Sequence, residues 1–132
     1  MKQSMHWTIE FIDETYVLVV THGTFTAQGQ IDLVEDILTR EFWRPGRLTL
    51  FDHRDLDFSE STIDTIQSAS DTHVRNDERI GKAKTAIVLK DSLAYGNARQ
   101  FMGITRDMIS ATLALFTDMD SAKKWLLDAQ SH

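Results

Sequence analysis

Residues 84–101 read KTAIVLKDSLAYGNARQF, and this stretch decides the fold. Positions 85–89 are Thr, Ala, Ile, Val and Leu without polar alternation, which is typical of a strand covered on both faces in a helix-flanked parallel sheet. Asp91 and Ser92 then offer N-cap side chains for a helix. Because unpaired N–H groups at a helix start converge near the carboxyl end of the preceding strand, we expect an α/β fold with a binding edge there.

The rest of the chain alternates strands with helices after an N-terminal hairpin. Polar and apolar residues alternate over 7–11, a turn follows at 13–15, and a β-branched run begins at Tyr16. Apolar spacing predicts the other elements, which are helices over 24–42, 59–73 and 121–129 and strands over 48–52 and 111–116.

Local signals set the expected ends of these elements. Thr26 is a candidate cap for the first helix, and Pro45, the single proline, prevents that helix from continuing. Either Ser59 or Ser61 is expected to cap the second helix. The segment 75–81 is charged, and we expect it to form a loop before the buried strand.

Length and charge limit the possible functions. With 132 residues, the chain is expected to form one domain, 1–132, whose core is large enough to be stable without disulfide or metal cross-links. Twenty acidic and fourteen basic side chains give a formal charge of −6, and the basic residues do not cluster. A nucleic-acid partner is therefore not expected, because its phosphates would be repelled.

The sequence lacks cysteine and long apolar runs. The absence of cysteine removes disulfides, thiolate catalysis and thiolate metal ligation, and it suits a reducing compartment. The first ten residues do not resemble a signal peptide, and no run approaches the roughly 20 apolar residues that cross a bilayer. We therefore expect a cytoplasmic protein without a transmembrane segment.

Three motifs carry a resemblance that covers nearly the whole chain. They are LAYGNARQF at 93–101, LFDHR at 50–54, and 116–126, which ends in DSAKKWL. With these motifs in this order, the chain resembles the SpoIIAA-like (STAS-type) family of small bacterial proteins. The resemblance implies a singly wound β/α superhelix with a mixed, mostly parallel sheet of about five strands, an N-terminal hairpin and about four helices. This fold is shared with the CRAL-TRIO lipid-binding domains, and most relatives have no assigned activity.

A phospho-switch is the most concrete activity that the resemblance implies. In anti-sigma antagonists, a serine at the start of the helix after the third strand is phosphorylated within an Asp-Ser-Ser-Gly type motif. Here Ser59 and Ser61 lie near that place, but the Ser-Ser-Gly element is missing. The neighbouring carboxylates of Asp57, Glu60 and Asp64 would resist added phosphate charge. We therefore interpret the two serines as capping residues rather than phosphorylation sites.

Candidate enzyme chemistry is weak throughout the sequence. Asp55 and Asp57 resemble the paired aspartates of magnesium-assisted phosphoryl transfer, but they do not follow the buried strand directly. The histidines show no spacing typical of zinc ligands, and Ser92 with His53 lacks a nucleophile elbow. We therefore predict no metal, no cofactor and no enzymatic activity.

The helix from Ser92 contains the better binding argument. Its expected packing stripe runs from Ala94 to Met108 through Ala98, Phe101, Met102 and Thr105. Tyr95 and Arg99 fall on a different, polar side. Gly96 and Gly103 lie seven residues apart, so they are nearly aligned and suit a close approach by another surface.

Two hypotheses about function remain. The first is a noncatalytic interaction or regulatory module, expected to form a homodimer or bind a protein partner through the side of Tyr95 and Arg99. Trp43 belongs to this surface if it is exposed, and to the core if it is not. The alternative is a binder of a small amphipathic or lipid-like anion in a pocket at the carboxyl ends of the strands. The predicted ligand-binding residues are Asp52, Arg54, Ser92, Tyr95, Gly96 and Arg99.

Overall fold

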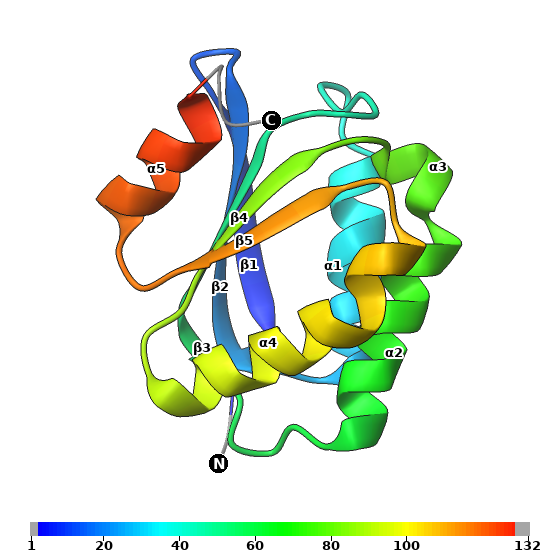
Figure 1. Ribbon diagram of the computed structural model, residues 1–132, viewed down its shortest axis with the longest axis vertical. Helices are drawn as coiled ribbons and strands as arrows, with labels where there is room; N and C mark the ends of the chain where they lie inside the picture. The colour runs from blue at the N-terminus through cyan, green and yellow to red at the C-terminus, as the bar shows by residue number, and fades with distance from the viewer. Residues whose placement is uncertain (1–2, 129–132) are drawn as a thin grey trace.

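A five-stranded mixed sheet organises the protein, whose computed structural model describes residues 3–128 (Figure 1). The strands lie in sequence order, β1-β2-β3-β4-β5. β1 pairs antiparallel with β2, and all other neighbours are parallel. The strands are β1 His6–Ile12, β2 Tyr16–Thr24, β3 Thr49–Asp57, β4 Lys84–Val88 and β5 Thr112–Phe116. This sequential order is the singly wound, mixed sheet that the sequence predicts.

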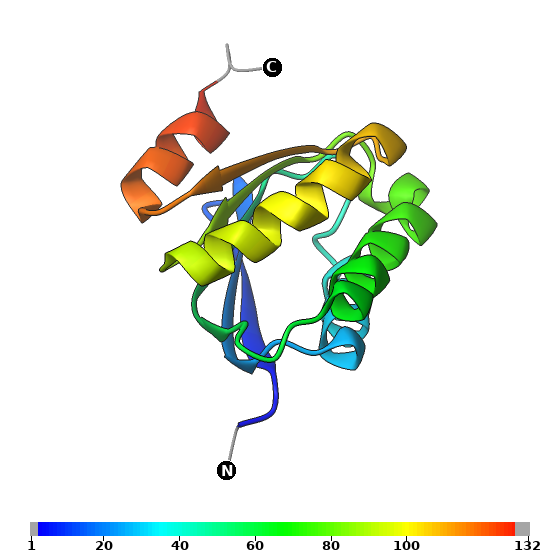
Figure 2. The ribbon, with the colours of Figure 1, turned by 60° about the horizontal axis from the view of Figure 1, so that its bottom comes forward.

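The helices lie on both faces of the sheet. They are α1 Ala27–Leu38, α2 Ile63–Arg75, α3 Asp77–Ile80, α4 Ser92–Thr105, the 3-10 helix η1 Arg106–Met108, and α5 Met119–Leu127. α1, α2 and α4 cover one face, and α5 covers part of the other (Figures 1 and 2). The strand of the opening motif is buried at four of its five positions, since it is central and covered on both sides.

Alternation along the strands divides the core between these two faces. Val17 and Val19 of β2 pack with Leu33 and Ile37 of α1 on one face. On the other face, β3 and β4 pack against α5 through a cluster that includes Leu50, Ala86, Val88, Ala122 and Leu126. Because successive side chains point to opposite faces, every strand residue is assigned to one of these two layers.

The first helix ends earlier than predicted, and Trp43 explains the difference. α1 stops at Leu38, where the hydroxyl of Thr39 donates to the carbonyl of Glu35 at 2.9 Å. The chain then turns so that Trp43 enters the core with 9% of its surface exposed. Its Nε1 donates to the carbonyl of Arg79 at 2.9 Å. Trp43 is therefore a core residue in this chain and not part of an exposed surface.

The start of the second helix also differs from the prediction. Thr62, and neither Ser59 nor Ser61, caps α2. Its hydroxyl accepts from the Thr65 backbone N–H, and its own backbone N–H donates to the Thr65 hydroxyl. Phe58 is buried before this turn, which delays the helix start.

The sequence-based prediction missed one further element and made another too short. The predicted loop 75–81 contains the short helix α3, which buries Ile80. β3 continues to Asp57 instead of ending at Asp52, with a register irregularity opposite Val20 to His22. A bulge of this kind re-aims side chains.

The packing stripe of α4 is shorter than predicted. Asp91 caps the helix, accepting from the Ala94 N–H at 2.9 Å, while Ser92 is its first residue. Ala94 and Thr105 are buried as expected, but Met108 is 59% exposed because the α-helix gives way to η1 at Arg106.

Candidate functional site

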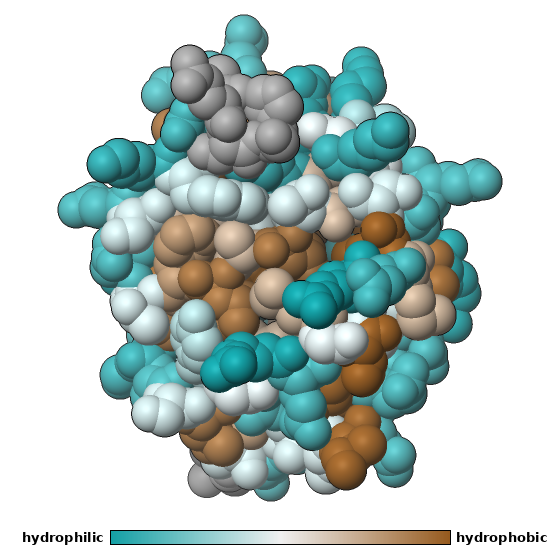
Figure 3. All heavy atoms as spheres, in the orientation of Figure 1, coloured by the Kyte–Doolittle hydropathy of each residue, from teal (hydrophilic) through white to brown (hydrophobic). Residues whose placement is uncertain are grey.

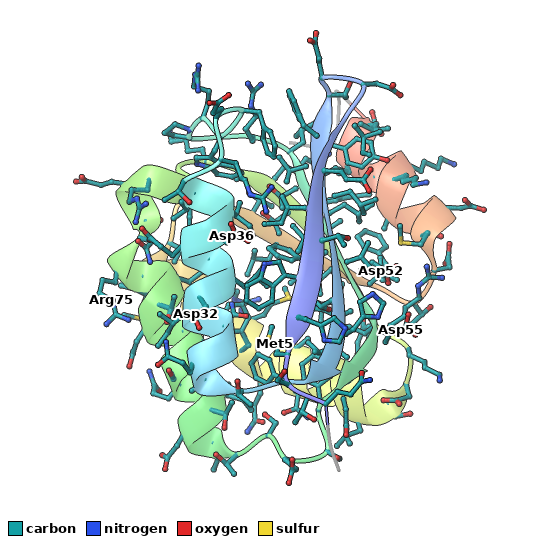
Figure 4. All side chains as sticks on the ribbon, turned by 180° about the vertical axis from the view of Figure 1, so that it is seen from behind. Met5, Asp32, Asp36, Asp52, Asp55 and Arg75 are labelled. Atoms are coloured by element: carbon teal, nitrogen blue, oxygen red, sulfur yellow. The ribbon has the colours of Figure 1, made fainter. Side chains whose placement is uncertain are left out.

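Asp52 and Arg54, two of the predicted ligand-binding residues, form an ion pair with each other. Arg54 donates from Nε and from a terminal nitrogen to the two carboxylate oxygens of Asp52, each at 2.9 Å. Burial raises the pKa of Asp52, but the hydrogen bonds and charge of Arg54 outweigh it and leave the pKa below its usual value. Asp52 lies on the side of the sheet toward α5 (Figure 4).

The predicted residues on α4 belong to the opposite face. Ser92 and Arg99 are exposed, and Tyr95 packs partly against the core beneath α4. A side chain at Gly96 would meet no atom within 4 Å. The structure therefore brings Asp52 together with Arg54, and Tyr95 together with Arg99 on one helix, but it separates the two groups by the thickness of the sheet.

The candidate phosphorylation sites lie in the connection from β3 to α2. The backbone N–H of Ser59 donates to the carboxylate of Asp57 at 2.8 Å. The hydroxyl oxygen of Ser61 is shielded from solvent and has no hydrogen-bond partner among the described residues. This geometry does not test the prediction that neither serine is phosphorylated.

Residues 3–128 contain neither a metal-binding cluster nor a membrane-spanning helix. No group of three or more histidine, cysteine, aspartate or glutamate side chains in that range could hold a metal ion. In the same range, no helix is long and apolar enough to cross a membrane. His53 does not turn toward Ser92, since its Nδ1 lies 2.6 Å from the hydroxyl of Thr21.

A cavity of about 80 Å³ lies between the sheet and helices α1, α2 and α4. Its wall is mostly apolar and aromatic, with a few polar groups. The lining residues are Phe25, Gln30, Val34, Phe51, His53, Phe58, Ile66, Ala69, His73, Thr85, Ile87, Leu89, Asn97, Ala98 and Phe101. Partly exposed residues, among them Phe25, Gln30 and Asn97, form its rim.

The cavity lies beneath the carboxyl ends of three parallel strands. Phe25, Phe58 and Leu89 line it, and they directly follow the last residues of β2, β3 and β4 respectively. Open α/β sheets bind ligands at this edge, because the loops and helix starts there surround a crevice. A second cavity of about 30 Å³ adjoins the first and shares His73 and Phe51 with it.

Two histidines line the wall beside the polar side chains of Gln30, Thr85 and Asn97. His53 Nδ1 is bonded to the Thr21 hydroxyl, and its ring lies 5.4 Å from that of Phe51 between centroids. His73 stacks obliquely near Phe101 at 5.7 Å, and its Nδ1 has no hydrogen-bond partner among the described residues. Burial lowers the pKa of each imidazole to about 4, so both are neutral at pH 7.

The sequence predicts a pocket at the carboxyl ends of the strands, but it does not identify the residues that line this cavity. The lining comes from segments far apart in the chain, and the sequence offers the histidines only as metal ligands or bases. One signal was available, because His73 continues the apolar stripe of α2 at a spacing of four residues from Ala69 and seven from Ile66. A histidine on such a stripe is expected to face the interior.

The comparisons with known proteins define the fold. The chain is similar in structure to an uncharacterised protein of the DUF3478 family with a SpoIIAA-like fold from Shewanella loihica PV-4. The two are 18% identical, the match covers 96% of this chain and 95% of that one, and the TM-score is 0.61. The chain therefore has a SpoIIAA-like fold, and the likeness extends to the fold alone. No family model matches the sequence, and no curated protein matches it.

Proposed function

We propose that this protein is a noncatalytic binding module that holds a small, mostly apolar molecule in the cavity beneath α1, α2 and α4. The single observation that carries the proposal is the position of this cavity, which Phe25, Phe58 and Leu89 line at the carboxyl ends of three neighbouring strands. Apolar walls with a few converging polar groups are typical of small-molecule sites.

The shape of the pocket supports a ligand. It opens to solvent on one side, so water reaches it in the empty protein, and its wall is mostly apolar. A molecule with an apolar body that displaces this water gains about 25 cal/mol for each Å² of apolar surface that it buries.

The composition of the wall supports a noncatalytic role. None of the lining residues carries a carboxylate, ammonium or guanidinium group. A general acid–base pair needs two groups whose protonation states differ near neutral pH, and the two histidines are both neutral there. The cavity is therefore suited to holding a molecule rather than transforming it.

Toluene is a suitable probe for the cavity. An engineered apolar cavity of about 150 Å³ binds benzene, and this pocket has about half that volume but opens to solvent, so we expect toluene to enter with part of its ring beyond the partly exposed rim residues. In a ¹H–¹⁵N NMR titration, toluene should shift and saturate the signals of lining residues such as Ala69 and Phe101. Absence of saturable shifts up to the solubility of toluene would contradict the proposal.

A cavity-filling variant provides the matched control. Ala69 lines the cavity with 4% of its surface exposed, so Ala69→Leu should occupy the space and abolish toluene binding. Ala27, at the start of α1, is partly buried but does not line the cavity, so Ala27→Leu should bind toluene as the wild type does. Equal binding by both variants would place the toluene elsewhere.

A homodimer is a second candidate, favoured by the surface of α4 and β5. Leu93 and Ile104 are 55% and 42% exposed on α4, and a side chain at Gly96 or Gly103 would meet open space. β5 is the last strand of the sheet order, and apolar residues gather along it in Figure 3. An uncovered apolar edge strand beside a helix with exposed glycines suits a second copy of this chain.

Light scattering tests this second candidate. Gly96→Leu has room within one chain and should leave the fold intact, but it should convert a dimer to a monomer if α4 forms the interface. Arg99→Ala should weaken the dimer if the polar side of α4 takes part. A wild-type protein that is monomeric at 100 μM, or a Gly96→Leu dimer as stable as the wild type, would exclude this interface.

A further inference from the structure

The two ring nitrogens of His53 have different surroundings. Its Nδ1 lies 2.6 Å from the hydroxyl oxygen of Thr21, and its Nε2 has no hydrogen-bond partner within the described part of the chain. Among residues 3–128, only Ser61 Oγ and His73 Nδ1 are unpaired side-chain polar atoms that are closed off from solvent. Because the Nε2 of His53 is unpaired and is not one of these two atoms, it is accessible to a water-sized group.

The accessible nitrogen faces the cavity. Nδ1 is bonded to Cγ, the ring atom nearest the backbone, and it is directed along the sheet toward Thr21 of the neighbouring strand β2. Nε2 is therefore at the far tip of the ring, where it projects from β3 toward the layer between the sheet and the helices. The rings of Phe51 and Phe58 lie beside that of His53, with centroids 5.4 and 6.1 Å away, and all three residues line the cavity.

Thr21 determines which nitrogen of His53 carries the proton. The fully buried hydroxyl of Thr21 has one proton, which it donates to the carbonyl oxygen of Asp52 at 3.3 Å. Its oxygen is then the acceptor for His53, so the proton of the neutral imidazole is on Nδ1. This tautomer leaves a lone pair on Nε2, and the cavity wall therefore presents a hydrogen-bond acceptor.

We propose that the cavity ligand is a neutral molecule with an N–H or O–H group on a small apolar body, and that this group donates a hydrogen bond to Nε2 of His53. The inference rests on the proposed binding function and names the chemistry that the same site selects. The apolar part of the wall, which includes Ile87, Leu89 and Phe101, fits the apolar body.

The charge of the surroundings selects against ions of either sign. None of the lining residues carries a carboxylate, ammonium or guanidinium group. Arg54 is paired with Asp52, and Arg99 is exposed on α4, so neither of these arginines lines the cavity. An anion or an ammonium ion in the cavity would lose hydration without gaining a countercharge, whereas a neutral N–H or O–H group loses only one or two hydrogen bonds to water.

Water is the competing partner of His53, because the cavity opens to solvent. A ligand with a donor replaces the hydrogen bond from water to Nε2, whereas a ligand without a donor displaces the water and leaves Nε2 unpaired. Pyrrole and furan separate these cases. Their rings have nearly the same shape, but pyrrole has an N–H group where furan has an oxygen. Furan is the less soluble of the two in water, so burial of apolar surface alone favours furan.

NMR titrations with pyrrole and furan at pH 7.5 test the inference. We expect wild-type protein to bind pyrrole about fivefold more tightly than furan, which is the effect of one net hydrogen bond. His53→Phe keeps a ring of similar size and should bind both molecules, with furan at least as tightly bound as pyrrole. His22→Phe is the matched control, because it replaces a histidine outside the cavity and should keep the wild-type preference.

The outcomes separate this inference from the proposed function. If pyrrole, furan and toluene all fail to bind wild-type protein, the binding function itself is wrong. If they bind but furan binds at least as tightly as pyrrole, or if His53→Phe keeps the preference for pyrrole, the site exists but His53 does not select the ligand. Should His53→Phe fail to fold, the imidazole ¹⁵N signals of wild-type His53 decide. Nε2 should give the signal of an unprotonated nitrogen that pyrrole shifts and furan does not, and an unprotonated Nδ1 or equal shifts with both molecules would overturn the inference.

Discussion

Acid should destabilise this protein through His73, and the size of the effect follows from its burial. Burial lowers the pKa of His73 from 6.5 to about 4, and the more distant charge of Asp77 opposes this shift without reversing it. The unfolded chain therefore binds a proton near pH 6.5 that the folded chain accepts only near pH 4. The stability is complete above pH 6.5 and is lost as the pH falls through this window.

The magnitude can be calculated from these two values. A shift of about 2.5 units corresponds to about 3 kcal/mol once the pH is below 4. At pH 5, where the unfolded form is largely protonated and the folded form largely neutral, the loss is about 2 kcal/mol. His73→Phe removes this contribution, so wild-type protein should lose about 2 kcal/mol more than the variant between pH 7.5 and pH 5.

Urea denaturation followed by tryptophan fluorescence at the two pH values measures the difference. The carboxylates of Asp36, Asp52 and Asp118, whose pKa values are lowered in the fold, titrate equally in both proteins and cancel. His53 cancels in the same way, because it is present in both. If the two proteins lose the same stability to within about 0.5 kcal/mol, His73 is not buried in its neutral form.

Three further changes should be measurable by urea denaturation at pH 7.5. Thr62→Ala should lower the free energy of unfolding by about 1 kcal/mol, because it removes the α2 cap. Ser61→Ala, the control, should change it by less than about 0.5 kcal/mol. Equal effects of the two substitutions would contradict the cap assignment. Trp43→Phe should cost about 1 kcal/mol through the lost bond to the Arg79 carbonyl; no change would mean that water replaces it. Asp52→Asn should lower the free energy of unfolding by about 1 kcal/mol, because it removes the ion pair with Arg54. No change would mean that solvation of the Arg54 guanidinium replaces the ion pair.

The strands could be predicted from the sequence because each carries a local signal. Alternation at 7–11 marks β1, and the unbroken apolar run at 85–89 marks a strand buried on both faces. The second half of β3 lacked such a signal, since His53, Arg54 and Asp55 are polar in succession. They can occupy a strand because the register irregularity between Val20 and His22 places His53 toward the interior and leaves Arg54 exposed.

The lining and size of the cavity could not be predicted, because no local signal describes them. Its wall combines β3, β4, α1, α2 and α4, and its volume depends on how far the helices lie from the sheet. The predicted anion site consisted of side chains such as Arg99, whose position on an exposed helix face can be predicted from the spacing of polar and apolar residues. Sequence patterns separate inside from outside, but they do not show where the inside is incompletely filled.

Only two buried side-chain polar atoms lack a partner among the described residues, and their surroundings differ. Ser61 is partly exposed, so a small shift brings its hydroxyl to water. His73 is buried and its ring lines the pocket at the edge of the sheet where parallel strands end, but its Nδ1 itself is closed off from solvent. A fold optimised for stability alone would place an apolar ring there, since an unpaired buried nitrogen carries a cost. A polar ring kept beside a mostly apolar pocket at this edge of the sheet therefore supports the binding function proposed for it.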